Sequence, residues 1–145
     1  MKKTCVVILT YNNSSDTLNC IRSVLEFNSA PVKFIVIDNG SDNDERKSEL
    51  KEEMAGLFGD GLTIMTDADC EASGRLSVAT LLLSSTNNGY ASGNNKGLHL
   101  TFRDDEIDNV LILNNDILFV EDIIPRLLKH LADTPDAAIV SPLLY

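Results

Sequence analysis

The regular alternation of short apolar runs with segments of helical periodicity is the feature that most constrains the fold of this chain. Short apolar runs bounded by polar residues are typical of strands that are buried on both faces. Strands alternating with helices indicate an α/β fold, in which a mostly parallel sheet carries helices on both faces. We therefore expect strands at 4–9, 34–37, 62–65, 78–84, 110–113 and 138–141.

The middle of the chain is less regular than its two ends. We expect only one of the runs at 62–65 and 78–84 to belong to the central sheet. The polar stretch 67–77 lacks periodicity and is predicted to be a loop or an insertion.

Four helices are predicted between the strands, and three of them have candidate caps, because Ser and Asp side chains accept hydrogen bonds from the free N–H groups of a first turn. The third helix is expected at about 91–102, with Leu98 and Phe102 on one face. The candidate caps are Ser14, Ser15 or Asp16 for the first helix, Ser41 for the second, and Asp122 for the fourth, whose Pro125 falls in the first turn.

Length and charge limit the classes of function. The 145 residues suit a single domain, 1–145, and carry 12 Lys and Arg against 22 Asp and Glu, a formal net charge of −10. This negative excess argues against a nucleic-acid groove as the main site. It does not argue against a phosphate ligand, because a bound divalent cation can reverse the local charge. No apolar run is long enough to span a bilayer.

The three cysteines lie far apart and lack C-x-x-C spacing, so neither a zinc site nor a disulfide framework is predicted. Cys5 and Cys20 fall in apolar patterns and are expected to be buried, whereas Cys70 is expected to be an exposed thiol. Free thiols favour the cytoplasm as the compartment, with peripheral association at the inner face of the membrane left open.

Polar residues collect where the predicted strands end. The clusters 10–12, 38–41 and 114–116 directly follow strands, and a fourth cluster, 87–95, opens a helix. Ligands of open parallel sheets bind beyond the carboxyl ends of the strands. The joint placement of these clusters therefore favours a ligand site at one edge of the sheet.

The residue types in the clusters suit a nucleotide with a metal ion. Tyr11 offers a ring for stacking, Asp38 a carboxylate for ribose or base donors, and Asp116 a carboxylate for Mg²⁺ or Mn²⁺ on a diphosphate. Taken singly, each of the three also fits a turn or a packing role. The P-loop, the G-x-G-x-x-G opening of a classical dinucleotide fold and the G-x-S-x-G hydrolase elbow do not occur.

Four segments, taken together, resemble glycosyltransferase family 2. They are VVILTYN at 6–12, VIDNGS at 36–41, NNGYASGNNKG at 87–97 and LILNND at 111–116, in the order and spacing of that family. The last segment stands where the family has its D-x-D-type motif. Asn114 replaces the first aspartate of that motif, a form that is frequent in members related to rhamnosyltransferases.

The resemblance implies a GT-A fold and an inverting transfer of a sugar from a nucleotide-diphosphate sugar, such as a UDP- or dTDP-sugar, to a glycan or lipid-linked acceptor. It implies Mg²⁺ or Mn²⁺ as the cofactor, with Asn114 a weaker ligand than an aspartate. The residues that it places in the donor site are Thr10, Tyr11, Asp38 and Asn39 beside the nucleoside, Asn94 and Asn95 near the nucleotide and diphosphate, Asp116 on the metal, and Asn12, Asn114 and Asn115 beside them.

Members of the family continue well beyond the part that this chain resembles, and that later part shapes the acceptor site and supplies the general base. We therefore expect a truncated, inactive donor-binding half, and a homodimer through exposed apolar surface is left open. Residues 104–106 are expected in a solvated loop, and His99 and His130 in surface or packing roles.

Two other functions stay open. A sugar-nucleotidyltransferase would open with a glycine-rich segment, which 10–13 lacks. A non-catalytic nucleotide-binding or interaction module is favoured by the asparagine at 114.

Overall fold

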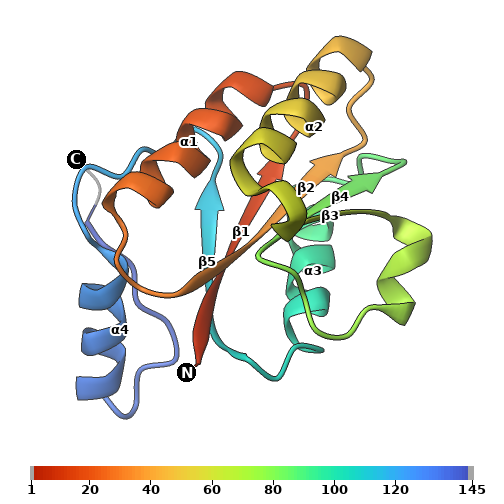
Figure 1. The fold of residues 1–145 in the computed structure, drawn as a ribbon. Helices are drawn as coiled ribbons and strands as arrows, with labels where there is room; N and C mark the ends of the chain where they lie inside the picture. The colour runs from red at the N-terminus through yellow and green to blue at the C-terminus, as the bar shows by residue number, and fades with distance from the viewer. Residues whose placement is uncertain (1, 144–145) are drawn as a thin grey trace.

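The structure, a computed structural model, describes residues 2–143, and within them five parallel strands form one sheet (Figure 1). The strands are β1 (Lys3–Thr10), β2 (Val32–Asn39), β3 (Leu62–Thr66), β4 (Ala79–Ser84) and β5 (Ile107–Asn114). Their order across the sheet is β3-β4-β2-β1-β5, and every neighbouring pair is parallel. The predicted α/β fold with a parallel sheet is confirmed.

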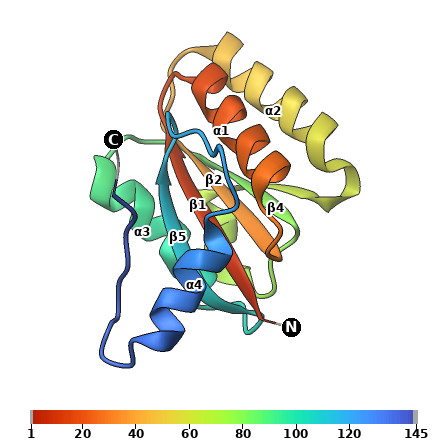
Figure 2. The same ribbon diagram turned by 90° about the vertical axis from the view of Figure 1, so that its left-hand side faces the viewer.

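Helices cover both faces of the sheet, as Figures 1 and 2 show. Helices α1, α2 and α4 lie on one face and α3 on the other. None of the helices within residues 2–143 combines the length and apolar character needed to cross a bilayer. Their bounds are α1 (Ser14–Phe27), α2 (Asp44–Phe58), α3 (Tyr90–Thr101) and α4 (Ile124–Asp133), with short 3-10 helices η1 (Gly59–Gly61) and η2 (Asp67–Ala72).

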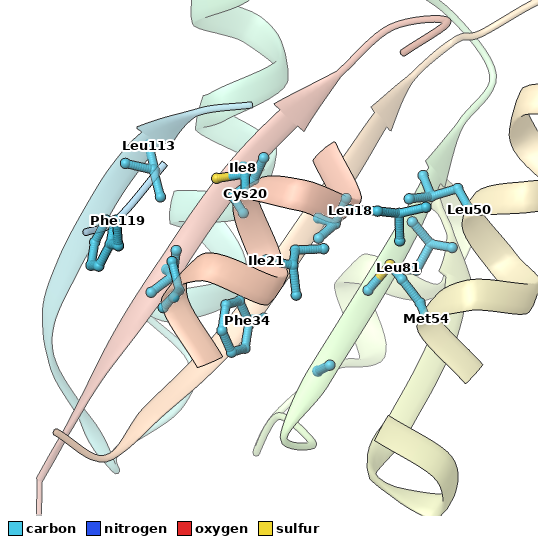
Figure 3. Packing of buried hydrophobic residues seen from close by; sticks show 14 of the residues in the cluster. Ile8, Leu18, Cys20, Ile21, Phe34, Leu50, Met54, Leu81, Leu113 and Phe119 are labelled. Atoms are coloured by element: carbon cyan, nitrogen blue, oxygen red, sulfur yellow. The ribbon is translucent and has the colours of Figure 1, made fainter. Parts of the chain in front are cut away.

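Side chains that alternate along the strands build two separate cores, because successive strand residues point to opposite faces. On one face Ile8 and Phe34 pack with residues of α1 and α2, including Ile21 and Met54 (Figure 3). On the other face Val7 and its neighbours pack under α3. The buried positions of Cys5 and Cys20 were predicted, and burial raises the pKa of each thiol to about 12. Cys70 is half-buried against the second core rather than fully exposed.

Two parts of the middle of the chain differ from the prediction. The expectation that only one of the runs at 62–65 and 78–84 joins the sheet was wrong, because β3 pairs with β4 from Leu62 to Thr66 and forms the edge of the sheet. The stretch predicted as a loop begins with η2, in which the Thr66 hydroxyl and the Asp69 carboxylate form a capping box. The segment 138–141 is no strand, and Ile139 is 88% exposed. A strand without a hydrogen-bonded neighbour is not stable in water.

The helix caps also differ from the prediction. Asn13 caps α1 by accepting from the Asp16 N–H, and Asn43 caps α2 by accepting from the Arg46 N–H. Neither cap was among the predicted residues. Asparagine accepts hydrogen bonds from N–H groups at a helix start as well as serine does, so the two asparagines can take this position. Asp122 does not cap α4 but accepts hydrogen bonds from the backbone N–H and hydroxyl of Ser29. Pro125 lies in the first turn of α4, as predicted.

The face that α3 buries was predicted wrongly. Phe102 is exposed, and the helix instead turns two glycines toward the sheet. A Cβ atom on Gly97 would lie 2.7 Å from Val7 Cγ1 and 2.9 Å from Ile37 Cδ1. A Cβ atom on Gly93 would lie 2.4 Å from Leu9 Cδ1. The glycines therefore let α3 lie directly on β1 and β2, which brings its first turn close to their carboxyl ends.

Asp104, expected in a solvated loop, is buried at the opposite, amino-terminal edge of the sheet. Its Oδ2 lies 2.7 Å from Lys33 Nζ, and the two side chains are 0% and 4% exposed. Lys33 also donates to the Leu76 carbonyl oxygen and pairs with Glu106 at 2.9 Å. The prediction failed because the sequence neighbours of Asp104 are polar, whereas its partner on β2 is remote in sequence.

Candidate functional site

The register of the sheet aligns the polar residues that follow the strands. Thr10 pairs with Asp38 across β1 and β2, Leu9 pairs with Asn114 across β1 and β5, and Asn39 pairs with Ser84 across β2 and β4. Since all strands run the same way, their carboxyl ends form one edge of the sheet. This edge, which we call the carboxyl edge, carries most of the predicted site residues.

Asp38 is the most buried of the predicted ligand contacts, with an exposed fraction of 2%. Its Oδ1 accepts a hydrogen bond from the Ser41 N–H at 2.8 Å, which folds the turn after β2 back over the strand end. Its Oδ2 receives no hydrogen bond from the described residues. This oxygen is not one of the fully buried unpaired side-chain atoms, so solvent reaches it and a ligand donor could do the same.

Asn12 ties together the loops that follow β1 and β2. Its backbone N–H donates to Ser41 Oγ at 2.8 Å, its Nδ2 donates to Asp42 Oδ1 at 2.6 Å, and its Oδ1 accepts from the Asn43 N–H at 3.1 Å. Its φ of 48° lies in the left-handed region, which asparagine tolerates better than most residues. Asn12 therefore has a structural role, in which it holds the two loops together, whereas the ring of the neighbouring Tyr11 is exposed.

Thr10 and Asn115 take part in one chain of internal hydrogen bonds. Thr17 Oγ1, on the first turns of α1, lies 2.8 Å from Thr10 Oγ1 and accepts from Asn115 Nδ2 at 3.3 Å. Thr10 Oγ1 also donates to the Asn13 carbonyl oxygen at 3.1 Å. These contacts join the ends of β1 and β5 to α1 and fix their relative positions.

Asn39 joins the end of β2 to the residues just before α3, and Asn94 bonds within the first turns of α3. Asn39 Nδ2 donates to Asn87 Oδ1 at 3.0 Å and to the Gly89 carbonyl oxygen at 3.3 Å, and Asn94 Nδ2 donates to the Tyr90 carbonyl oxygen at 3.1 Å. The Oδ1 atoms of Asn39 and Asn94 are buried, and neither has a hydrogen-bond partner within residues 2–143. A donor from an ordered water or a ligand would satisfy each of them.

Asp116 lies at the tip of the turn that follows β5. The Ile117 N–H donates to the Asn114 carbonyl oxygen at 3.2 Å and closes this turn. Asp116 is exposed. The pKa of Cys20 is raised mainly by the burial of its thiol and to a smaller extent by the negative charge of Asp116. Asn114 is also exposed, and its Oδ1 accepts from the Tyr90 hydroxyl at 3.0 Å.

The metal ion that the resemblance implies can be tested against these donors. Within residues 2–143, no group of three or more His, Cys, Asp and Glu side chains could hold a metal ion. Mg²⁺, however, is usually held by one or two carboxylates together with substrate phosphates and water. The exposed Asp116 carboxylate fits this arrangement, and a cation there would depend on a bound diphosphate for most of its ligands.

Asn95 lies on a different side of α3 from Asn94. It lines a cavity of about 410 Å³ between α3 and η2, together with Asp67 and Lys96. Burial opposes the charged form of Asp67, but hydrogen bonds from Lys96 and Ser85 hold the pKa of its carboxyl below the usual value. Asp67, Lys96 and Ser84 are joined by hydrogen bonds where β3 and β4 end. A second cavity, of about 290 Å³, lies under 63–77 and contains none of the predicted site residues.

Ser41 and Tyr90 have roles at the carboxyl edge that were not predicted from the sequence. Ser41 was expected to cap a helix, and it instead accepts from the Asn12 N–H. The third helix was expected from about residue 91, and Tyr90 is in fact its first residue, with its hydroxyl against Asn114. Its aromatic ring beside a glycine-rich helix start was the available signal.

A family model described as Glycosyl transferase family 2 matches residues 5–145, nearly the whole chain. The chain belongs to this family. The match accounts for the α/β architecture, which agrees with a GT-A fold, and identifies a glycosyltransferase of a family that binds nucleotide-sugar donors and acceptors. It goes against the sugar-nucleotidyltransferase alternative. A search of curated proteins finds no match to the chain.

Proposed function

We propose that the carboxyl edge binds a UDP- or dTDP-sugar together with Mg²⁺ or Mn²⁺, for inverting transfer of the sugar to a glycan or lipid-linked acceptor. The observation that carries this proposal is the buried Asp38, whose Oδ2 faces no donor from the described residues. The exposed Tyr11 follows β1, which lies next to β2, and the exposed Asp116 follows β5, on the far side of β1.

Each residue has a distinct task in this proposal. Asp38 accepts a hydrogen bond from the base or ribose, and the Tyr11 ring packs against the nucleoside. Asp116 holds the cation beside the diphosphate, and Asn12 and Ser41 keep the two loops in place. The cation, when bound, stabilises negative charge on the leaving diphosphate.

Inversion follows if the acceptor hydroxyl attacks the anomeric carbon from the side opposite the diphosphate. The new bond forms between the hydroxyl oxygen and that carbon, the bond from the carbon to the diphosphate oxygen breaks, and the hydroxyl proton passes to a general base. We assign the base to none of the described residues. The proposed part of this chain in the reaction is therefore donor binding and support of the leaving group.

The experiment is calorimetric titration of the chain with UDP and dTDP, with and without Mn²⁺. Asp38→Asn and Asp116→Asn remove one negative charge each with little change of shape. Asp60→Asn is the matched control, because Asp60 is exposed and precedes β3 at the opposite edge. We expect the wild type to bind one nucleotide, Asp38→Asn to lose affinity about tenfold or more, which is about 1.4 kcal/mol, and Asp116→Asn to lose the effect of Mn²⁺.

Two results would contradict the proposal. A chain that is folded by circular dichroism but binds neither nucleotide has no donor site of its own. Equal affinities for the wild type and both site variants would place the nucleotide elsewhere.

A further inference from the structure

A contact between α3 and β5 at the carboxyl edge bears on how the diphosphate is held. The Tyr90 hydroxyl, at the first residue of α3, lies 3.0 Å from Asn114 Oδ1, at the last residue of β5. Tyr90 is 59% exposed, so its ring is not placed there by burial. The hydrogen bond is the contact that holds the two side chains together.

This hydrogen bond decides which atoms Asn114 offers to a ligand. The amide oxygen accepts from Tyr90, so one of its two lone pairs is occupied. The Nδ2 group donates to none of the described residues, and its two N–H donors stay available. Held in this way, Asn114 is better suited to donate a hydrogen bond than to ligate a cation.

The position of Asn114 beside Asp116 makes it important whether residue 114 donates a hydrogen bond or ligates a cation. The turn closed by the Ile117 N–H places an amide and a carboxylate two residues apart at the end of one strand. A carboxylate repels a diphosphate unless a cation lies between them, whereas an amide N–H attracts it directly. A carboxylate at 114 would therefore make diphosphate binding more dependent on the cation.

We propose that Asn114 donates a hydrogen bond from Nδ2 to a diphosphate oxygen of the bound nucleotide, and that Tyr90 is the positioning residue that orients it. This inference rests on the proposed function of the carboxyl edge. The pair supplies part of the diphosphate affinity without a metal ion, and the cation contributes through Asp116 alone.

The test is a set of calorimetric titrations with UDP and dTDP, in EDTA and in Mn²⁺, on Tyr90→Phe, Asn114→Ala, the double variant and Asn114→Asp. In EDTA we expect Tyr90→Phe to lose about three- to tenfold in affinity, the range of one neutral hydrogen bond. Tyr90→Phe should have no further effect once residue 114 is alanine. Asn114→Asp should bind more weakly than the wild type in EDTA and regain affinity with Mn²⁺.

The controls separate this role from a structural one. Asn109→Asp makes the same substitution near the other end of β5 and should leave nucleotide affinity unchanged. The thermal midpoint of Tyr90→Phe should match that of the wild type, because the ring is exposed and a single hydrogen bond between exposed side chains adds little to stability.

Several outcomes would overturn the inference while leaving the proposed function standing. A wild type that binds nucleotide only with Mn²⁺ has no metal-independent contact. Variants at 90 and 114 that lose affinity in Mn²⁺ but not in EDTA would make Asn114 a metal ligand. Tyr90→Phe with unchanged affinity would remove the positioning role. A wild type that binds neither nucleotide under either condition would instead contradict the proposed function itself, and this inference with it.

Discussion

The buried pair of Lys33 and Asp104 predicts a large loss of stability from a single charge change. Asp104 accepts three hydrogen bonds, from Lys33 Nζ at 2.7 Å, from the Leu76 N–H at 2.9 Å and from the Glu106 N–H at 3.0 Å. In Asp104→Asn, one carboxylate oxygen becomes an NH₂ group. Because both oxygens face N–H donors, the new group must face a donor whichever way the amide turns.

The size of the effect follows from what the variant leaves behind. Breaking a buried ion pair by removing one partner costs about 3–5 kcal/mol. Lys33 keeps Glu106 at 2.9 Å, so we expect the lower end, about 3 kcal/mol. That is a large part of the roughly 5–15 kcal/mol that stabilises a domain. At about 2–4 °C per kcal/mol for a domain of this size, Tm should fall by about 10 °C.

The assay is urea unfolding at pH 7, followed by far-ultraviolet circular dichroism. Asp133→Asn is the matched control, because Asp133 pairs with Lys129 on the surface of α4, where such a pair contributes at most about 1 kcal/mol. Nucleotide binding should not change in Asp104→Asn, since the pair lies at the edge opposite the proposed site. A free energy of unfolding within about 0.5 kcal/mol of the wild type would refute the reasoning, because it would mean that the charge of Asp104 is not needed.

Three further predictions follow from the packing and the pKa values. Burial opposes the charged form of Asp104, but its hydrogen bonds lower the pKa of its carboxyl below the usual value. Its contribution to stability is therefore complete above the unfolded pKa of about 4 and is lost as the pH falls through the folded pKa. Urea unfolding between pH 7 and pH 2 should show this loss of stability, and a flat profile would contradict it. Gly97→Ala should destabilise the chain by about 1–3 kcal/mol, because its Cβ atom would meet the β1 core, whereas Gly56→Ala, with open space around its Cβ atom, should be neutral or stabilising by up to about 1 kcal/mol. Cys70 should react slowly with a thiol reagent in the native protein, while the two buried thiols react only in urea; three equally fast thiols would show that the cores are open.

The pattern of apolar runs located the five strands of the sheet, because a parallel sheet buried on both faces needs such runs. It was not enough to predict their neighbours. Whether 62–65 pairs with 78–84 depends on contacts between segments distant in the chain, which no local pattern records. The run at 138–141 also shows that composition does not determine pairing. Its residues suit a strand, but no described strand lies beside it and it does not form one.

Asparagines are the least predictable part of the candidate site. An asparagine side chain serves equally to contact a ligand or to bond the backbone of a neighbouring loop. In this structure Asn12 and Asn39 bond neighbouring loops, and the sequence alone does not distinguish that role from ligand binding. Helical geometry did hold a signal for Asn94 and Asn95, because adjacent helix residues point about 100° apart and therefore have different surroundings.

Two buried aspartates at opposite edges of the sheet show how hydrogen-bond saturation separates a structural role from a binding one. Asp104 and Asp38 are about equally buried. Asp104 accepts three hydrogen bonds and pairs with an ammonium group, so a ligand would have nothing to add to it. Asp38 accepts one hydrogen bond from a turn and pairs with no cation among the described residues. Of the two buried aspartates, folding has thus left acceptor capacity in the one at the carboxyl edge, and this is the physical reason for proposing that the nucleotide binds there.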